Sequence, residues 1–144
     1  MMIKKIGIVA NIAKEKSPVY TAALREWILK RGLEVYLEEG IAAKIGCPPG
    51  VEKTKLWTTV DLLVVFGGDG TILRTARLVR KRDVPIVGIN LGGFGYLTEV
   101  NLNEMYAAME LILAGDFQLE KRMMLDVEIQ GGGEPFREGT VLND

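Results

Sequence analysis

The apolar run DLLVVF, residues 61–66, limits the folds open to this chain more than any other feature of the sequence. A short run that is almost free of polar residues predicts a strand buried on both faces of its sheet. Residues 3–10 and the segment PIVGIN, residues 85–90, have the same character. Strands of this kind are typical of parallel sheets with helices on either side. We therefore expect an α/β domain built on a parallel sheet.

Helical patterns separate these strands, as the crossovers of a parallel sheet require. Ser17, followed by a proline, predicts the N-cap of a first helix, and Gly32 predicts its end. Residues 71–82 predict a second helix. The segment LEVYLEE, residues 33–39, predicts a further strand, whereas residues 40–55 predict only a loop with weak structure.

A third helix is expected over residues 102–113, where apolar residues recur at helical spacing. Asn101 with Glu104 predicts a capping box at its start, and Gly115 predicts its end. Both glycine-rich stretches of this region, GGDG and LGGFG, follow a predicted strand directly. Ligands of parallel α/β sheets bind at the carboxyl ends of the strands. The two stretches are therefore the first indication of a functional site.

The pattern changes after residue 118. Two extended segments joined by the glycine-rich sequence GGGEP replace the strand–helix alternation. We interpret residues 1–118 as an α/β nucleotide-binding domain and residues 119–144 as the first strands of an all-β domain. Two strands do not make an independently stable sheet domain, so we expect this chain to be a fragment of a longer protein.

Composition excludes several classes of function. The formal net charge is −1, which gives no bulk field for nucleic acid or for an anionic membrane, and no segment reaches the length of about 18 apolar residues that a spanning helix needs. Histidine is absent and Cys47 is the single cysteine, so Ser-His-Asp and Cys-His catalysis and a zinc site are not expected. One unpaired cysteine indicates a reducing, cytoplasmic setting.

The sequence GGDG, residues 67–70, allows two interpretations. It could be a tight strand-to-helix turn with Asp69 as a local cap. Alternatively, its glycines let a ligand approach the main chain, and the start of the following helix favours a phosphate group. A kinase that acts on an alcohol needs a carboxylate beside a polyphosphate cradle, and Asp69 between glycines is expected to be unobstructed. The chemistry favours the second interpretation.

Three motifs together resemble those of the NAD kinases. FGGDGTILRTARL resembles the first family signature, GINLGGFGYLTEV (residues 88–100) the second, and the closing TVLND the third. GGDGT alone is shared with 6-phosphofructokinases and with diacylglycerol and sphingosine kinases. The second stretch is what indicates NAD kinase in particular.

The resemblance implies a NAD kinase/6-phosphofructokinase-like parallel-sheet domain, an all-β domain after it, and a substrate site between them. It implies phosphoryl transfer from ATP, or from polyphosphate in some members, to the 2′-hydroxyl of the NAD adenosine ribose, with Mg²⁺. Homodimers or homotetramers of the complete protein are expected, without nucleic-acid or membrane partners. The site residues that it implies are Asp69 as general base, Gly68, Gly70 and Thr71 at the phosphates, Arg74 as a phosphate or substrate contact, Tyr96 at the adenine, and Asn143 and Asp144 at polar edges of NAD.

Two departures from the family and two alternatives remain. Asp144 stands where the family usually has glutamate, and Leu97 stands where some members carry a second aromatic residue. The alternatives are a lipid or sugar kinase that shares GGDGT, and a nucleotide-binding or assembly fragment without turnover. Asn11 and Lys14, which follow the first strand, could meet a nucleotide phosphate or belong to an ordinary loop. Arg77 and Lys81 fit a solvated basic face better than a ligand site.

Overall fold

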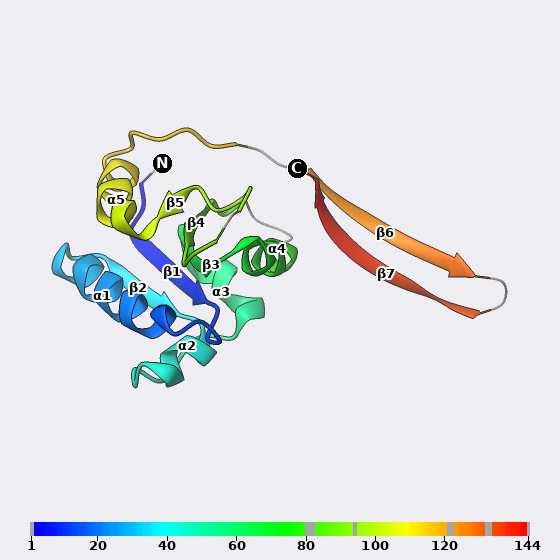
Figure 1. Cartoon of the computed structure of the whole chain (residues 1–144), viewed down its shortest axis with the longest axis horizontal. Coiled ribbons are helices and arrows are strands. Elements are labelled where there is room, and N and C mark those ends of the chain that lie inside the picture. The colour runs from blue at the N-terminus through cyan, green and yellow to red at the C-terminus, as the bar shows by residue number, and fades with distance from the viewer. Residues whose placement is uncertain (1, 80–82, 94, 121–122, 132–133, 144) are drawn as a thin grey trace.

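The computed structural model describes residues 2–79, 83–93, 95–120, 123–131 and 134–143. Its centre is a parallel five-stranded sheet, which confirms the predicted fold class (Figure 1). The order of the strands across the sheet is β2-β1-β3-β4-β5. Their bounds are β1 Lys5–Ala10, β2 Glu34–Leu37, β3 Leu62–Gly67, β4 Ile86–Asn90 and β5 Val100–Asn101.

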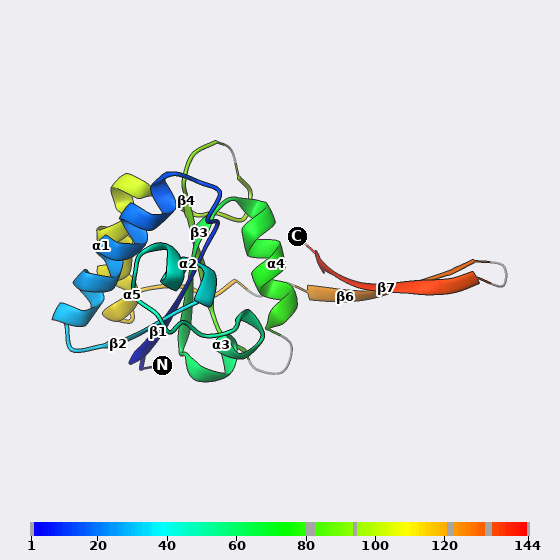
Figure 2. The ribbon, with the colours of Figure 1, turned by 90° about the horizontal axis from the view of Figure 1, so that it is seen from below.

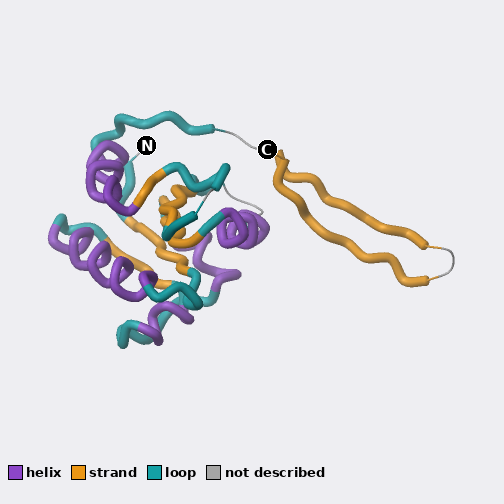
Figure 3. The backbone as a smooth tube through the Cα atoms, viewed as in Figure 1, coloured by secondary structure: helices purple, strands orange, loops and turns teal. Residues whose placement is uncertain are grey.

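Helices cover both faces of the sheet, as Figure 3 shows. They are α1 Lys16–Lys30, α2 Glu39–Lys44, α3 Lys53–Thr59, α4 Asp69–Leu78 and α5 Met105–Leu113, the last preceded by the 3₁₀ turn η1 Leu102–Glu104. Helices α1, α2 and α5 lie on one face, and α3 and α4 lie on the other (Figure 2).

Alternating side chains of the central strands build two apolar layers. Ile6 and Ile8 of β1 are fully buried with Leu24 and Ile28 of α1. On the opposite face, Val65 of β3 belongs to the cluster under α3 and α4. Burial on both faces is why the strands read as unbroken apolar runs in the sequence. The sheet is therefore a rigid platform for the loops at its carboxyl end.

The chain moves toward opposite edges of the sheet on the two sides of the β1–β3 pair. From β1 the chain passes outward to β2, and from β3 it passes the other way to β4 and β5. Connections that leave in opposite directions open a crevice at the carboxyl ends of the two central strands, which is where parallel α/β sheets bind ligands. Ala10 ends β1 and Gly67 ends β3 at this edge, since Ala10 pairs with Phe66 in register.

The prediction of a loop over residues 40–55 is wrong, because α2 and the first part of α3 lie there. Both helices are short, with 6 and 7 residues. Helices of this length have little intrinsic stability and depend on tertiary packing, here through Ile41 and Leu56, which the apolar clusters bury. Sequence periodicity over so few residues is too weak to predict them.

Two predicted helix caps are also wrong. Helix α1 begins at Lys16, and the hydroxyl of Ser17 donates to the backbone carbonyl of Asn11 at 2.6 Å instead of capping the helix. Before α5 the amide of Asn101 donates to the carboxylate of Glu104 at 3.0 Å, so the two side chains bond each other and not the helix backbone. Both predicted helix ends are confirmed, with Gly32 and Gly115 at positive φ.

The two extended segments predicted near the carboxyl terminus form an antiparallel hairpin of β6 Met123–Gly131 and β7 Glu134–Asn143. The hairpin projects away from the layered part of the chain, and the end of β7 returns to the side of α4 (Figures 1 and 2). Whether residues 119–144 begin a separate domain stays a prediction.

Candidate active site at the carboxyl end of the sheet

The two glycine-rich stretches meet at Asp69. Its carboxylate accepts one hydrogen bond from the backbone N–H of Tyr96 at 2.8 Å and another from that of Leu97 at 2.9 Å. Asp69 is the first residue of α4, directly after β3, and the two amides belong to the loop that follows β4. The side chain of Asp69, which was predicted to be unobstructed, therefore holds the loop after β4 against the turn after β3 through these two hydrogen bonds.

These contacts set the charge state of the carboxyl group. The hydrogen bond from the backbone N–H of Tyr96 lowers the pKa of Asp69 most, partial desolvation opposes this, and the N–H groups of Leu97 and Thr98 lower it further. Asp69 is therefore an anion at neutral pH. An ionised carboxylate has about four lone-pair sites, so these three amides still leave acceptor capacity for a ligand.

Two glycines allow close packing at this junction, Gly95 between the two loops and Gly67 within the first. A Cβ atom on Gly95 would lie 2.8 Å from Oδ1 of Asp69 and would also overlap the hydroxyl of Thr98. A Cβ atom on Gly67 would lie 2.6 Å from Oγ1 of Thr71. Both distances are shorter than carbon–oxygen contacts allow, so each glycine is needed for close packing and not only for a turn. Gly95 of LGGFG is thus explained by the contact between the two loops, and Gly67 of GGDG by packing inside its own turn.

The other predicted residues of the first motif surround the start of α4. Gly68 is the N-cap in extended conformation with open space where a side chain would stand, and Gly70 is exposed. Thr71 is buried, and its hydroxyl accepts a hydrogen bond from the guanidinium of Arg74 at 3.3 Å. The structure therefore brings four predicted residues together with Asp69 at one helix N-terminus, where free N–H groups and the helix dipole favour anions.

The predicted residues outside the first motif are placed differently. Tyr96 contacts Asp69 through its backbone, while its side chain is 87% exposed, which leaves the ring free to stack on a ligand. Asn143 is the last residue of β7 and pairs with Met123 in the hairpin. Asp144 lies outside the described residues. The roles expected of these three residues stay predictions.

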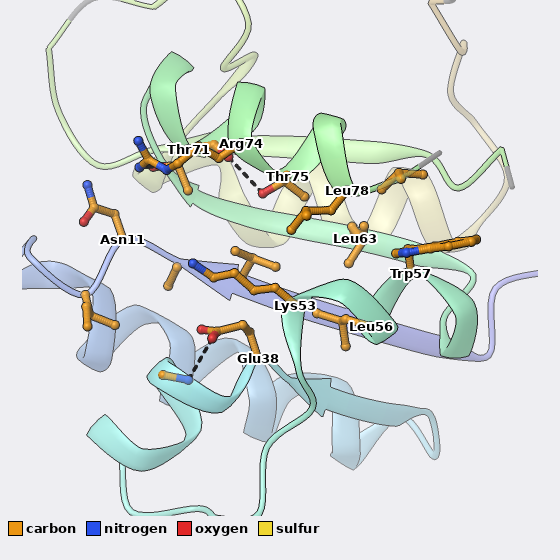
Figure 4. Close-up of a pocket in the computed structure, with 15 residues that line it drawn as sticks. Asn11, Glu38, Lys53, Leu56, Trp57, Leu63, Thr71, Arg74, Thr75 and Leu78 are labelled. Atoms are coloured by element: carbon orange, nitrogen blue, oxygen red, sulfur yellow. Dashed lines mark hydrogen bonds between the residues drawn. The ribbon is translucent and has the colours of Figure 1, made fainter. Parts of the chain in front are cut away.

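A cavity of about 150 Å³ lies beside this junction, between α3, α4 and the carboxyl end of β1. Figure 4 shows its polar end, with Asn11 and Arg74, and its opposite end, with Trp57. Of the two residues proposed to meet a phosphate after the first strand, Asn11 lines the cavity and Lys14 does not. Lys53 and Trp57, both on α3, also line it, and no sequence motif marks either residue.

Glu38 forms the acidic wall of the cavity. It is 6% exposed, and its carboxylate accepts hydrogen bonds from the backbone N–H groups of Gly40 at 2.9 Å and Ile41 at 3.3 Å. These two amides begin α2, so the negative charge is balanced by the helix N-terminus and not by a cation of the cavity. Glu38 could not be identified from the sequence, because glutamate is an uncommon N-cap and the helix that it caps was not expected.

Comparison with known proteins identifies the family. The sequence model of the ATP-NAD kinase N-terminal domain matches residues 6–117. The chain belongs to the NAD kinase family. The NAD kinase of Geotalea daltonii is 43% identical over 142 residues, which cover 99% of this chain and 50% of that protein. The NAD kinase of Citrifermentans bemidjiense is 41% identical over 145 residues, with the same shares. The chain thus spans about half the length of the curated NAD kinases that it matches.

Solved structures of NAD kinases have the same fold. A yeast NADH kinase in complex with NADH superposes with a TM-score of 0.72 at 18% identity, covering 99% of this chain and 47% of that one. An NAD kinase from Archaeoglobus fulgidus in complex with ATP gives 0.58 at 23% identity, covering 86% and 40%. In the part of the chain that the structure describes, no helix has the length and apolar character needed to cross a bilayer.

Proposed function

We propose that the protein containing this chain transfers a phosphoryl group from ATP, or from polyphosphate, to the 2′-hydroxyl of the adenosine ribose of NAD, which gives NADP. The observation that carries the proposal is the junction at Asp69, where an ionised carboxylate, a glycine turn and a helix N-terminus meet at the carboxyl edge of a parallel sheet. Family membership and relatives named NAD kinase support the choice of acceptor.

Asp69 is the proposed general base. Phosphoryl transfer needs little covalent chemistry from the protein, so catalysis depends on positioning and on balancing phosphate charge. The carboxylate accepts the proton of the ribose hydroxyl as that oxygen attacks the terminal phosphorus of the donor, while the bond from this phosphorus to the bridging oxygen breaks and releases ADP, or a polyphosphate shortened by one unit. The backbone N–H groups around Gly68 and Gly70, at the start of α4, stabilise the charge that develops on the phosphate oxygens, and Thr71, whose own N–H already donates to the carbonyl of Gly68 at 3.2 Å, lies beside them.

Mg²⁺ is the proposed cofactor, bound together with the phosphates of the donor. Among the described residues, no three histidine, cysteine, aspartate or glutamate side chains cluster as metal ligands, while Asp69 places a single carboxylate beside the phosphate cradle. This donor set fits Mg²⁺, which is commonly held by one or two carboxylates, water and substrate phosphates. When bound, the ion would neutralise phosphate charge.

The remaining proposed contacts come from both parts of the chain. Arg74 binds phosphate or substrate from the second turn of α4, and Tyr96 packs against adenine. Asn143 and Asp144 hold polar edges of NAD, from a segment, residues 119–144, that we propose to be the start of an all-β domain. The NADH complex of the yeast relative and the ATP complex of the archaeal relative support nucleotide substrates. We further propose that the complete protein acts in the cytoplasm as a homodimer or homotetramer.

An acceptor panel tests this function. The complete gene product that contains residues 1–144 is given Mg²⁺ and ATP with NAD, diacylglycerol or fructose 6-phosphate, each in a separate reaction. We expect phosphorylation of NAD alone. Transfer to the lipid or to the sugar phosphate, with none to NAD, would assign the site to another kinase that uses GGDGT. ATP binding without transfer to any acceptor would indicate a nucleotide-binding module.

A further inference from the structure

The cavity beside Asp69 contains a cation that no sequence motif identifies. Lys53, on α3, extends along the cavity, and its ammonium end points toward the polar end where Asn11 and Arg74 lie (Figure 4). Among the described residues, Lys53 has no hydrogen-bond or ion-pair partner. The nearest acidic wall, Glu38, is already held by two backbone amides. The ammonium group is therefore available to an anion.

The position of the cavity indicates which anion. Its polar end is bounded by Thr71 and Arg74, which stand two and five residues after Asp69 on α4. A phosphate chain whose reacting end lies at Asp69 and the glycine turn would continue past these side chains toward Lys53. Two cations, a hydroxyl and an amide around one space suit phosphate oxygens, which are recognised by charge-assisted hydrogen bonds.

The size of the cavity limits what enters it. Pockets that enclose a complete drug-sized ligand measure roughly 300–1,000 Å³. At about 150 Å³ this cavity holds part of a nucleotide or a short phosphate chain. The phosphate chain is common to both donors that the function allows, ATP and inorganic polyphosphate.

We propose that Lys53 binds the phosphate chain of the phosphoryl donor, so that α3 forms one wall of the donor site and α4 the other. This inference rests on the proposed function for the identity of the donor and for the place of NAD beside Tyr96. In the proposed function NAD packs against Tyr96, whose loop is bonded to Asp69 and contributes no residue to the lining of this cavity. Lys53 is thus a donor-specific binding residue and makes no contact with NAD.

Lys55 provides a matched control on the same helix. It lies outside the residues that line the cavity, and its ammonium group pairs with Glu52 at 3.5 Å on the protein surface. Lys53→Met and Lys55→Met remove the same charge, keep a side chain of similar length and disturb the same helix. Exposed ion pairs of this kind contribute little to stability, so the loss of the Lys55 pair leaves α3 in place.

The test measures binding and turnover separately in the complete gene product. Binding of Mg-ATP and of tripolyphosphate is followed by calorimetry, with the fluorescence of Trp57, which lines the cavity, as a second signal. For Lys53→Met we expect the Kd of Mg-ATP or of tripolyphosphate, whichever the parent protein binds, to rise roughly tenfold. This is the effect of losing a charge-assisted hydrogen bond. The KM of NAD is expected to stay within about twofold, and Lys55→Met should resemble the parent in both measurements.

The outcomes separate this inference from the proposed function. Equal donor affinities of the two variants, in a protein that phosphorylates NAD normally, would overturn the role of Lys53 and leave the function intact. A rise in the KM of NAD that matches the rise for the donor would also overturn it, because Lys53 would then act on the whole site. Lys53-dependent binding of ATP in a protein that does not phosphorylate NAD would support the donor site and refute the function.

Discussion

Replacement of Asp69 by asparagine tests the junction of the two glycine-rich loops. The carboxylate holds the N–H groups of Tyr96 and Leu97 with one oxygen each. Asparagine keeps one oxygen acceptor, but its amide nitrogen is a donor and would face a second N–H donor. The variant therefore loses one charge-assisted hydrogen bond and gains a repulsive contact, while the shape of the side chain is unchanged.

The size of the effect follows from that single bond. A hydrogen bond to a charged group contributes about 1.5–3 kcal/mol, and because Asp69 is only half-buried we take the lower end of this range. A loss of about 1.5 kcal/mol corresponds to roughly tenfold in the equilibrium between the closed and open loop. Exchange of the Tyr96 and Leu97 amide protons with solvent should accelerate by about the same factor.

Amide hydrogen exchange measured by NMR checks the prediction residue by residue. Buried amides of β3, such as those of Val64 and Val65, report any change in global stability in the same spectra. Asp83→Asn is the matched control, since Asp83 is exposed and takes part in no interaction among the described residues. If Tyr96 and Leu97 exchange as slowly in Asp69→Asn as in the parent, Asp69 does not hold the loop and the junction is wrong.

Three further predictions concern the same loops and the sheet below them. Because the pKa of Asp69 is lowered in the folded chain, its hydrogen bonds to the Tyr96 and Leu97 amides should be complete at neutral pH and be lost only as the pH falls through that lowered pKa. The NMR shifts of these two amides should therefore titrate with a midpoint below the pKa of an ordinary aspartate, and a midpoint at or above that value would contradict the assignment. Gly95→Ala should speed exchange of the same two amides without changing the carboxylate, since its Cβ would meet Oδ1 of Asp69 at 2.8 Å, and unchanged exchange would show that the approach is not tight. Gly7→Ala should lower the free energy of unfolding by about 1–3 kcal/mol in urea denaturation, because its Cβ would lie 2.9 Å from Leu63 and 3.1 Å from Val60. An unchanged free energy of unfolding would mean that the apolar layer under α3 has room for a methyl group.

Much of the fold could be predicted because its signals are local. The apolar runs of β1 and β3 are buried on both faces, that of β4 is partly buried, and the glycines that end α1 and α5 adopt the positive φ that their positions require. The helices α2 and α3 could not be predicted, because 6 and 7 residues carry too little periodicity and their stability comes from packing against the sheet.

The part of the candidate site that could be predicted also depends on a local signal. Its first motif is contiguous, so the grouping of Gly68, Gly70, Thr71 and Arg74 around Asp69 follows from one strand–helix turn. The contact from Asp69 to Tyr96 spans 27 residues and depends on the order of strands in the sheet, which no local pattern records. Lys53 reaches the site from α3, and a lone lysine in a segment without motifs has no signal that separates it from a surface charge.

The rate of NADP formation by Asp69→Asn, compared with Asp83→Asn, Gly95→Ala and the parent in the complete gene product, tests the central claim most directly. A general base contributes roughly 10²–10⁴ in rate, so Asp69→Asn should lose turnover by about that factor while Asp83→Asn keeps it. Gly95→Ala, which loosens the loop but keeps the carboxylate, should fall between them. Parental turnover in a folded Asp69→Asn protein would contradict the account, because the carboxylate at the junction would then not take part in the transfer of phosphate to NAD.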